Sequence, residues 1–120
     1  MIAIGYDIGS SFVKAALVDA ETGRPIERVR VPDAEIPMIA DEIGWAEQDP
    51  KLWWEYLCDA TKSLIEKANI KADQISSIGI SYQMHGLVLV DKNLNPLRKS
   101  IIWCDSRATP YGEKAFQKLG

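Results

Sequence analysis

The chain of 120 residues is 47% hydrophobic and 26% charged, which is typical of one globular domain with a buried core. Its net charge of −3 provides no positive field for nucleic acid or an acidic membrane surface, so neither is expected as a partner. No apolar stretch approaches the roughly 20 residues that a membrane-spanning helix needs.

The amino terminus and the cysteines indicate a cellular compartment. Met1 leads directly into an apolar run, without a basic leader or a small-residue cleavage site. Cys58 and Cys104 form no CxxC pair, and one histidine in the whole chain argues against a zinc site. We therefore expect a reduced, cytoplasmic protein in which both thiols are buried.

The first third of the chain predicts three consecutive strands joined by short turns. Residues 2–7 and 12–19 are mostly apolar, as in buried strands, and residues 21–23 have the composition of a hairpin turn. Residues 26–31 alternate, with Val29 on one side and Arg28 and Arg30 on the other, which suits a strand near the edge of a sheet. This order predicts an antiparallel meander.

A helix is predicted to follow an irregular acidic loop at residues 32–44. Asp49 can cap the free N–H groups of the first turn, and Pro50 is tolerated at the first helical position. The helix is expected to end near Asn69. One apolar stripe recurs every three or four residues along it, formed by Trp53, Leu57, Ala60, Leu64 and Ala68.

The remaining residues predict a strand, a hairpin, a second short strand and a second helix. The strands are expected at 75–82 and 101–104, with a hairpin of 87–91 and 96–98 between them. The helix would start at Arg107 and be interrupted at Pro110 and Gly112.

The order of these elements favours an α/β fold with a mixed sheet and helices on its faces. A crossover between strands 75–82 and 101–104 would be right-handed if they are parallel. An ordinary doubly wound sheet is disfavoured, because the first turn lacks the G-x-G-x-x-G spacing and is followed by a strand.

The first candidate site lies at the end of the first predicted strand. Asp7 at a strand end can hold Mg²⁺ through water, while backbone N–H groups of the following turn face phosphate oxygens. Gly9 permits close approach of a ligand, and Ser10 and Ser11 add hydroxyl donors. Lys14 follows on the next strand and either faces solvent or pairs with a carboxylate. The alternative interpretation is a simple hairpin turn with no ligand.

The second candidate site follows strand 75–82. Gln83, Met84, His85 and Gly86 bring an amide, an imidazole and a flexible backbone to the end of a strand, where they could bind sugar hydroxyls. A single histidine is more often a structural or surface residue, so the motif by itself leaves this alternative open.

The third candidate site follows strand 101–104. Trp103 could offer a flat apolar face to a sugar ring, and Asp105 and Arg107 are hydrogen-bonding groups. The alternative is a core tryptophan beside a surface ion pair. The apolar stripe of the helix accounts for Trp53 and Trp54. Residues 45–50 are interpreted first as a loop that caps this helix and packs against it.

Taken together and in order, these motifs resemble the FGGY family of carbohydrate kinases, and within it the xylulose kinases. The segment Gln83-Met84-His85-Gly86 looks like the sugar-site segment of xylulose kinases, whereas glycerol kinases carry an Arg-Glu pair in that segment. The resemblance covers nearly the whole chain in four blocks: Asp7-x-Gly9-x-Ser11-x-x-Lys14, Trp45-x-Glu47-Gln48-Asp49-Pro50 followed by Trp53-Trp54, Gln83-Met84-His85-Gly86, and Ile102-Trp103-x-Asp105-x-Arg107.

The resemblance implies an actin-like ATPase (ribonuclease H-like) fold and transfer of the γ-phosphoryl group of ATP to a ketose hydroxyl, with D-xylulose as the expected substrate. Asp7 would position Mg²⁺-ATP, and it is the only metal residue that the resemblance assigns in this chain. Gly9, Ser10 and Ser11 would surround the phosphates.

The same resemblance implies a sugar-binding role for five residues. Met84 and His85 would line the sugar pocket together with Gln83, next to the aromatic face of Trp103. Asp105 would support that pocket from close by.

The resemblance also implies that residues 1–120 are roughly the first half of the first of two domains, in a protein that is a homodimer at full length. The second domain and the catalytic aspartate are expected outside this chain, which by itself should be inactive. An exposed sheet face or edge would then favour association. Two alternatives remain: a kinase of this family for another ketose, a polyol or a sugar acid, and a non-catalytic actin-like protein that binds nucleotide or partners.

Overall fold

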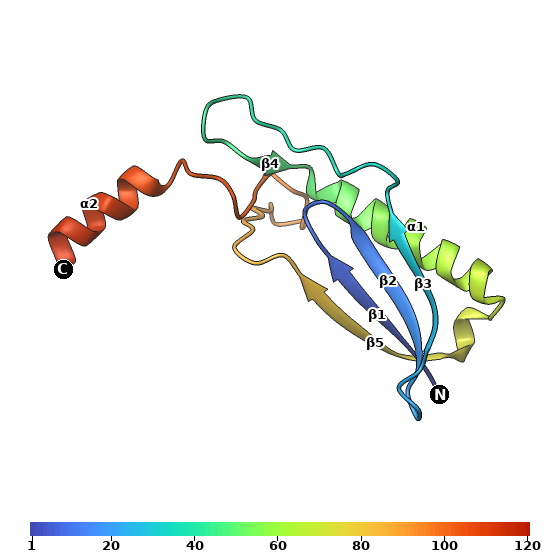
Figure 1. Cartoon of the computed structure of the whole chain (residues 1–120). Coiled ribbons are helices and arrows are strands. Elements are labelled where there is room, and N and C mark those ends of the chain that lie inside the picture. Colours follow the sequence, from blue (N-terminus) through green and yellow to red (C-terminus); the bar gives the residue numbers. More distant parts are fainter.

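The computed structural model describes all 120 residues, and its body is a four-stranded mixed sheet with one long helix on one face (Figure 1). Strands β1 (Ile2–Ile8), β2 (Val13–Asp19) and β3 (Pro25–Val31) form the predicted antiparallel meander. Strand β5 (Ile75–Tyr82) lies parallel to β1, which gives the order β3-β2-β1-β5. The prediction of a mixed sheet is therefore confirmed, with β3 at one edge.

The two faces of this sheet differ because neighbouring side chains of a strand point to opposite sides. Ile4 and Tyr6 of β1 are buried against the helix. Gly5 and Asp7 alternate with them and lie on the open face, where Gly5 is in register with Gly79 of β5. The open face therefore carries small and charged residues.

Helix α1 (Pro50–Ala68) covers the closed face and has the predicted bounds. The Asp49 side chain accepts a hydrogen bond from the Lys51 N–H and so caps the first turn. Asn69 ends the helix with a left-handed backbone, at a φ of 51°. The cap and the terminator that the sequence predicts are both present.

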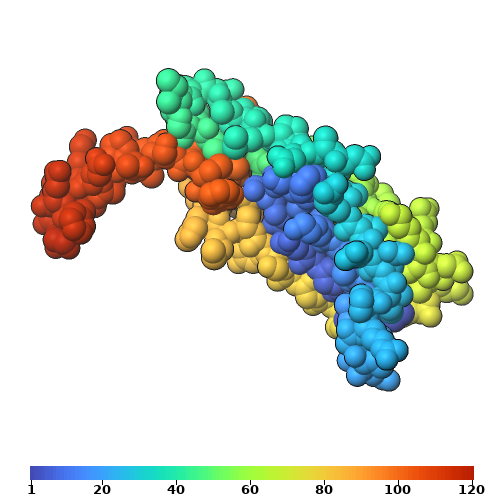
Figure 2. Space-filling view, in the orientation of Figure 1, coloured from blue at the N-terminus to red at the C-terminus, as the bar shows by residue number.

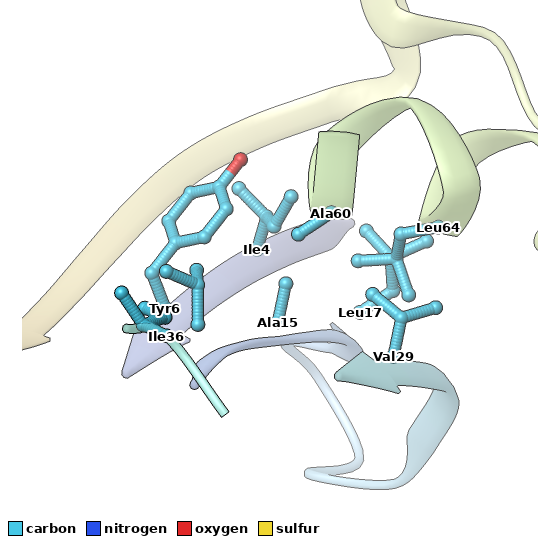
Figure 3. Packing of buried hydrophobic residues seen from close by; sticks show 9 residues of the cluster. Ile4, Tyr6, Ala15, Leu17, Val29, Ile36, Ala60 and Leu64 are labelled. Carbon is cyan, nitrogen blue, oxygen red and sulfur yellow. The ribbon is translucent and has the colours of Figure 1, made fainter. Parts of the chain in front are cut away.

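The core lies between α1 and the meander (Figure 3). The Tyr6 hydroxyl and the Thr61 hydroxyl are 2.7 Å apart, so the polar end of Tyr6 is paired where the strand meets the helix. The buried cluster consists of Ile4, Tyr6, Val13, Ala15, Leu17, Val29, Ile36, Ala60 and Leu64, with Trp53, Leu57 and Ala68 of the predicted stripe packed against it.

The predicted strand at 101–104 is wrong in its length and its partner. Only β6 (Ser100–Ile101) is extended, and it pairs antiparallel with β4 (Glu47–Gln48) in a separate two-stranded sheet. The expected right-handed parallel crossover from β5 to this strand therefore does not exist. The backbone turns after Ile102 because the Asp105 N–H bonds to the Ile102 carbonyl.

The predicted hairpin at 87–98 is present but short: the Asp91 N–H donates to the Asn95 carbonyl and the Leu97 N–H to the Leu89 carbonyl. Asp91 accepts hydrogen bonds from the backbone N–H groups of Asn93 and Asn95, and a single bridge joins Val90 to Pro96. The polar turn residues close the loop, but Pro96 lacks an N–H group and does not extend a ladder. A short 3₁₀ helix, η1 (Ala72–Gln74), connects α1 to β5.

Helix α2 (Thr109–Leu119) is continuous, contrary to the predicted interruption. Pro110 falls in the first turn, where its missing N–H group costs no intrahelical bond. The helix has no buried residue and projects away from the body (Figures 1 and 2). Neither helix combines the length and apolar content that crossing a membrane requires.

The expectation that both cysteines are buried is also wrong. Cys58 on α1 is only partly buried, and Cys104 is exposed. Cys104 lies in the turn after β6, and that turn is on the surface because β6 belongs to the small two-stranded sheet and not to the main one.

Candidate functional site

The turn between β1 and β2, residues 9–12, is held by three hydrogen bonds to its carbonyl groups. The Gly9 N–H donates to the Phe12 carbonyl over 3.0 Å, and the Ile36 N–H donates to the Ser11 carbonyl over 2.9 Å. The Gln48 side chain donates to the Ser10 carbonyl over 2.6 Å. A Cβ atom at Gly9 would lie 3.0 Å from the Phe12 oxygen, so this tight turn favours glycine.

Asp7 and Lys14 face each other across the two strands that lead into this turn. They are partners in the β1–β2 register, and the Lys14 Nζ lies 3.1 Å from an oxygen of Asp7. Both side chains are about half exposed, at 50% for Asp7 and 58% for Lys14. Of the two roles expected for Lys14, the structure shows the pairing with a carboxylate. The alternation of side chains along β1 places Asp7 on the open face of the sheet, and the ion pair lies on that face.

The donors at this turn fit a nucleotide with Mg²⁺ better than a metal ion alone. No three of the chain's carboxylates, histidines and cysteines come together as a metal-binding group. Mg²⁺ needs only one or two protein carboxylates when substrate phosphates and water complete its shell. Asp7 provides one such carboxylate, beside a turn whose serine N–H and hydroxyl groups can face phosphate oxygens.

The second predicted site lies directly beside the first. The Gln83 N–H donates to the Ile8 carbonyl over 2.9 Å, which extends the pairing of β5 with β1 beyond the strand. His85 has a φ of 62°, a left-handed backbone that few non-glycine residues adopt. Both polar atoms of the Gln83 amide are shielded from solvent and lack a hydrogen-bond partner. Met84, by contrast, is 71% exposed.

A cavity of about 350 Å³ adjoins this second segment, on the side of the sheet that carries α1. Gln83 and His85 line it together with Trp53 and Trp54. The sequence explained both tryptophans by the apolar stripe, but Trp54 is 67% exposed and belongs to the cavity wall. Asp7 lies on the opposite face, where a larger cavity of about 740 Å³ runs over the open sheet.

Trp103 reaches the turn of residues 9–12 from the other end of the chain. Its indole N–H donates to the Ser10 hydroxyl over 3.2 Å. Its side chain is exposed, so the alternative of a core tryptophan is wrong. The third predicted site therefore contacts the first, although 93 positions separate the two residues.

Asp105 has its carboxylate occupied by protein donors. It accepts from the Ala46 N–H over 2.6 Å and from Arg107 Nη2 over 2.7 Å, and its side chain is 2% exposed. The hydrogen bonds from the Arg107 guanidinium hold the pKa of the Asp105 carboxyl well below its ordinary value, against the opposing effect of burial. Asp105 therefore anchors the segment that carries Trp103.

Arg107 connects this anchor to the loop before α1. Its guanidinium lies 3.9 Å from the centre of the Trp45 ring and 2.8 Å from a carboxylate oxygen of Glu47, which is also paired with Arg98. The hydrogen bonds that Arg107 donates to Asp105 and to Glu47 raise the pKa of the Arg107 guanidinium above its ordinary value. The surface ion pair of the sequence analysis is thus part of a half-buried cluster of two acids and two arginines.

Sequence reasoning did not assign a role to Gln48 or Glu47, which the structure places beside the turn and the anchor. The available signal was the place of both residues in the block of residues 45–50 that resembles the kinase family; the structure shows both of them buried. The three predicted sites meet where β1 and β5 end: the turn of residues 9–12, an indole bonded to it, and an amide and imidazole beside it.

Comparison with known proteins agrees with this arrangement. Residues 2–119 match the family model for the N-terminal domain of the FGGY family of carbohydrate kinases. The chain is 36% identical over 117 residues to the xylulose kinase of Bacillus subtilis (strain 168), covering 98% of this chain and 23% of that protein. It therefore spans about a quarter of the length of the curated relatives that it matches.

Two solved structures are similar in fold and sequence. A ligand bound xylulose kinase from Lactobacillus acidophilus superposes with a TM-score of 0.86 at 30% identity, over 98% of this chain and 22% of that one. A gluconate kinase from Lactobacillus acidophilus superposes with a TM-score of 0.79, also at 30% identity, with the same coverage of 98% and 22%.

These likenesses confirm the predicted α/β fold of the actin-like ATPase class and the resemblance on which it was based. The match runs through all four sequence blocks and includes the turn, the tryptophan and the amide–imidazole segment. The chain belongs to the FGGY family of carbohydrate kinases.

Proposed function

We propose that this chain is the N-terminal part of an ATP-dependent kinase that phosphorylates a ketose, with D-xylulose as the substrate. The observation that carries the proposal is the contact between the candidate nucleotide and sugar segments. Trp103 donates to Ser10 of the turn, and Gln83 donates to Ile8 immediately before it. Phosphoryl transfer depends mainly on positioning the two substrates and neutralising charge, which requires such adjacency.

For the nucleotide, the proposal assigns the turn to the phosphates and Asp7 to Mg²⁺ through water. Gly9 leaves room for close approach, and Ser10 and Ser11 present N–H and hydroxyl groups. When bound, Mg²⁺-ATP supplies the γ-phosphoryl group. Lys14 holds the Asp7 carboxylate in place at the end of β1.

For the sugar, the proposal assigns Gln83, Met84 and His85 to the hydroxyls and Trp103 to the apolar face of the molecule. The unpartnered amide of Gln83 supports this assignment, because a shielded amide without a partner is unfavourable unless a ligand or water pairs with it. Asp105 does not contact the sugar in this proposal. It orients Trp103 by holding the backbone that follows β6.

We propose further that residues 1–120 are about the first half of the first domain, and that a second domain and the catalytic base lie elsewhere in the same protein. Ile78, Ile80 and Tyr82 of the edge strand β5 are each more than half exposed, as expected if other elements cover them. Alone, the chain should self-associate. Sedimentation of a sharp monomer at high concentration would contradict this assignment.

The full-length protein is proposed to be a cytoplasmic homodimer. The family resemblance supports the homodimer, and two cysteines that form no disulfide are consistent with a reducing compartment.

The test is release of ADP from Mg²⁺-ATP with D-xylulose, using the longest natural reading frame that starts with these residues. We expect turnover that is lost in His85→Ala and retained in Lys92→Ala, an exposed residue of the distant 91–95 turn. The 120-residue chain should show none. Absence of turnover by the full-length protein with D-xylulose would refute the substrate assignment.

A sugar acid is the second candidate substrate. The gluconate kinase of Lactobacillus acidophilus is as similar in sequence to this chain, at 30%, as the xylulose kinase of that organism. Comparing kcat/KM for D-gluconate with that for D-xylulose in the same assay decides between the two substrates. A tenfold preference corresponds to about 1.4 kcal/mol of transition-state binding.

A further inference from the structure

We propose that Gln48 is a positioning residue for the turn of residues 9–12: its side-chain amide holds the Ser10 carbonyl away from a bound phosphate and thereby orients the Ser11 N–H toward it. This inference rests on the proposed function, in which the turn faces the phosphates of a nucleotide.

Gln48 is a buried polar residue with every part of its amide engaged. Gln48 is the second residue of β4, and it is 1% exposed. The Nε2 atom donates to the Ser10 carbonyl over 2.6 Å and to the Ile36 carbonyl over 3.4 Å. The Oε1 atom accepts from the Trp53 indole N–H over 3.1 Å.

These partners determine which way round the amide stands. An indole N–H can only donate, so the atom that faces Trp53 must be the oxygen. The carbonyls of Ser10 and Ile36 can only accept, so the atom that faces them must be the NH₂ group. Glutamine is therefore the side chain that this position requires, because glutamate has no donor for the Ser10 carbonyl.

The planarity of the peptide group carries the effect of Gln48 to the other side of the turn. In a trans peptide the C=O of Ser10 and the N–H of Ser11 point in opposite directions. A Ser10 carbonyl held against Gln48 thus directs the Ser11 N–H away from the protein. The same reasoning applies to the next peptide, because Ile36 holds the Ser11 carbonyl and so orients the Phe12 N–H.

The result is a turn with its acceptors satisfied and its donors available. The carbonyls of Ser10, Ser11 and Phe12 each accept a protein hydrogen bond, while the N–H groups of the same three residues have no acceptor within the chain. A Cβ atom at Gly9 would lie 4.0 Å from the nitrogens of Ser11 and Phe12. Glycine therefore leaves open the space beside these two donors, as a site for an anion requires.

Gln48 also ties this turn to the start of α1. It lies directly before Asp49, which caps α1, and its oxygen is held by Trp53 in the first turns of that helix. Donors that are oriented before the ligand arrives need no reorganisation when charge develops on the phosphate. Gln48 is accordingly assigned to the nucleotide half of the site and not to the sugar half.

The experiment compares Gln48→Met with Thr61→Val in the full-length protein. Methionine preserves the length and much of the volume but removes the amide, whereas Thr61→Val removes a hydrogen bond between α1 and β1 that is remote from the turn. For Gln48→Met we expect the KM for Mg²⁺-ATP to rise about tenfold, with the KM for D-xylulose within about twofold of wild type. Thr61→Val should change neither constant.

Two further variants grade the effect. Gln48→Glu places a carboxylate against the Ser10 carbonyl, so two acceptors repel each other and its KM for Mg²⁺-ATP should exceed that of Gln48→Met. Trp53→Phe leaves the Gln48 amide in place but removes the indole N–H that orients it, together with part of the ring, and should give a smaller increase in the KM for Mg²⁺-ATP. If Gln48→Met is not obtained folded, this milder variant still tests the prediction.

Amide hydrogen exchange without any ligand provides a readout that does not depend on kinase activity. The N–H groups of Gly9 and Ile36, which donate to the Phe12 and Ser11 carbonyls of the turn, should exchange about fivefold faster in Gln48→Met than in wild type and at the wild-type rate in Thr61→Val. If wild type lacks kinase activity but this difference appears, the proposed function fails and the positioning role stands. Wild-type exchange in Gln48→Met, with an unchanged KM for Mg²⁺-ATP where activity exists, would overturn the inference.

Discussion

Residues 2–68 and residues 83–120 are held together in different ways. The first region, with the meander and α1, contains the buried apolar cluster. In the second region only Ser100 and Ile102 are buried, and large apolar side chains such as Leu97 and Phe116 are exposed. In Figure 2 the start of the second region lies against the body, and α2, in red, stands apart from it. A buried apolar core therefore stabilises residues 2–68 but not residues 83–120.

In residues 83–120, hydrogen bonds and ion pairs take the place of apolar packing. Ser100 donates to the Leu87 carbonyl, and the Ile102 N–H bonds to the Ala46 carbonyl. The ion pairs of Glu47 with Arg98 and Arg107, and of Arg107 with Asp105, join the loop before α1 to residues 98–107. Because such contacts depend on charge and on the geometry of single atoms, the segment that carries Trp103 should respond to acid and to isosteric substitutions, whereas the first region should respond to loss of volume.

The largest effect should come from removing volume in the first region. Leu64→Ala should lower the free energy of unfolding by about 3 kcal/mol, because it leaves a cavity in a fully buried site. Leu97→Ala, at a residue 65% exposed in the second region, should cost less than about 0.5 kcal/mol. Urea denaturation of the two variants measures the contrast, and equal losses would contradict it.

The next largest effect should come from the polar cluster. Asp105→Asn should cost roughly 2 kcal/mol, because Arg107 loses a charged partner in a half-buried site. Hydrogen exchange should become faster in residues 98–107 and stay unchanged in α1. Asp41→Asn serves as control, since it removes only an exposed pair with Lys99. Faster exchange throughout the chain would show that the cluster supports the whole fold.

Acid should reproduce part of that effect without a mutation. The pKa of Asp105 is lowered in the folded chain, chiefly by its hydrogen bonds from Arg107. Its contribution to stability is therefore fully present above the ordinary pKa of 3.8 and is lost as the pH falls below that value toward the folded pKa. Unfolding measured across this window should show a steeper loss for wild type than for Asp105→Asn; parallel curves would exclude Asp105 as the cause.

The smallest effect should come from the cap of α1. Asp49→Ala should cost about 1 kcal/mol, since it removes the acceptor for the Lys51 N–H. Asp59→Ala, on an exposed position within the same helix, is the matched control and should be near neutral. Circular dichroism during thermal unfolding separates the two, and an equal change would mean that helix propensity and not capping dominates.

Much of the first region could be predicted because its signals are local. Asp49, Pro50 and Asn69 mark the ends of α1 through contacts with neighbours a few positions away. The alternation in β3 reports which side of the strand is buried. The predictions for residues 83–120 were less accurate, since β6 is two residues long and pairs with a segment more than fifty positions earlier. No local pattern encodes such a partner.

The sequence by itself therefore determined the meander, the long helix and the family, and it placed Asp7, Gly9, Ser10 and His85 at strand ends where a site could form. Only the tertiary structure decided that Trp103 contacts Ser10, that the Ala46 N–H donates to Asp105, and that Gln48 holds the turn. The physical reason is that these hydrogen bonds join atoms 38 to 93 positions apart, and a hydrogen bond of that kind exists only once the sheet and helix have set the distance between its donor and acceptor.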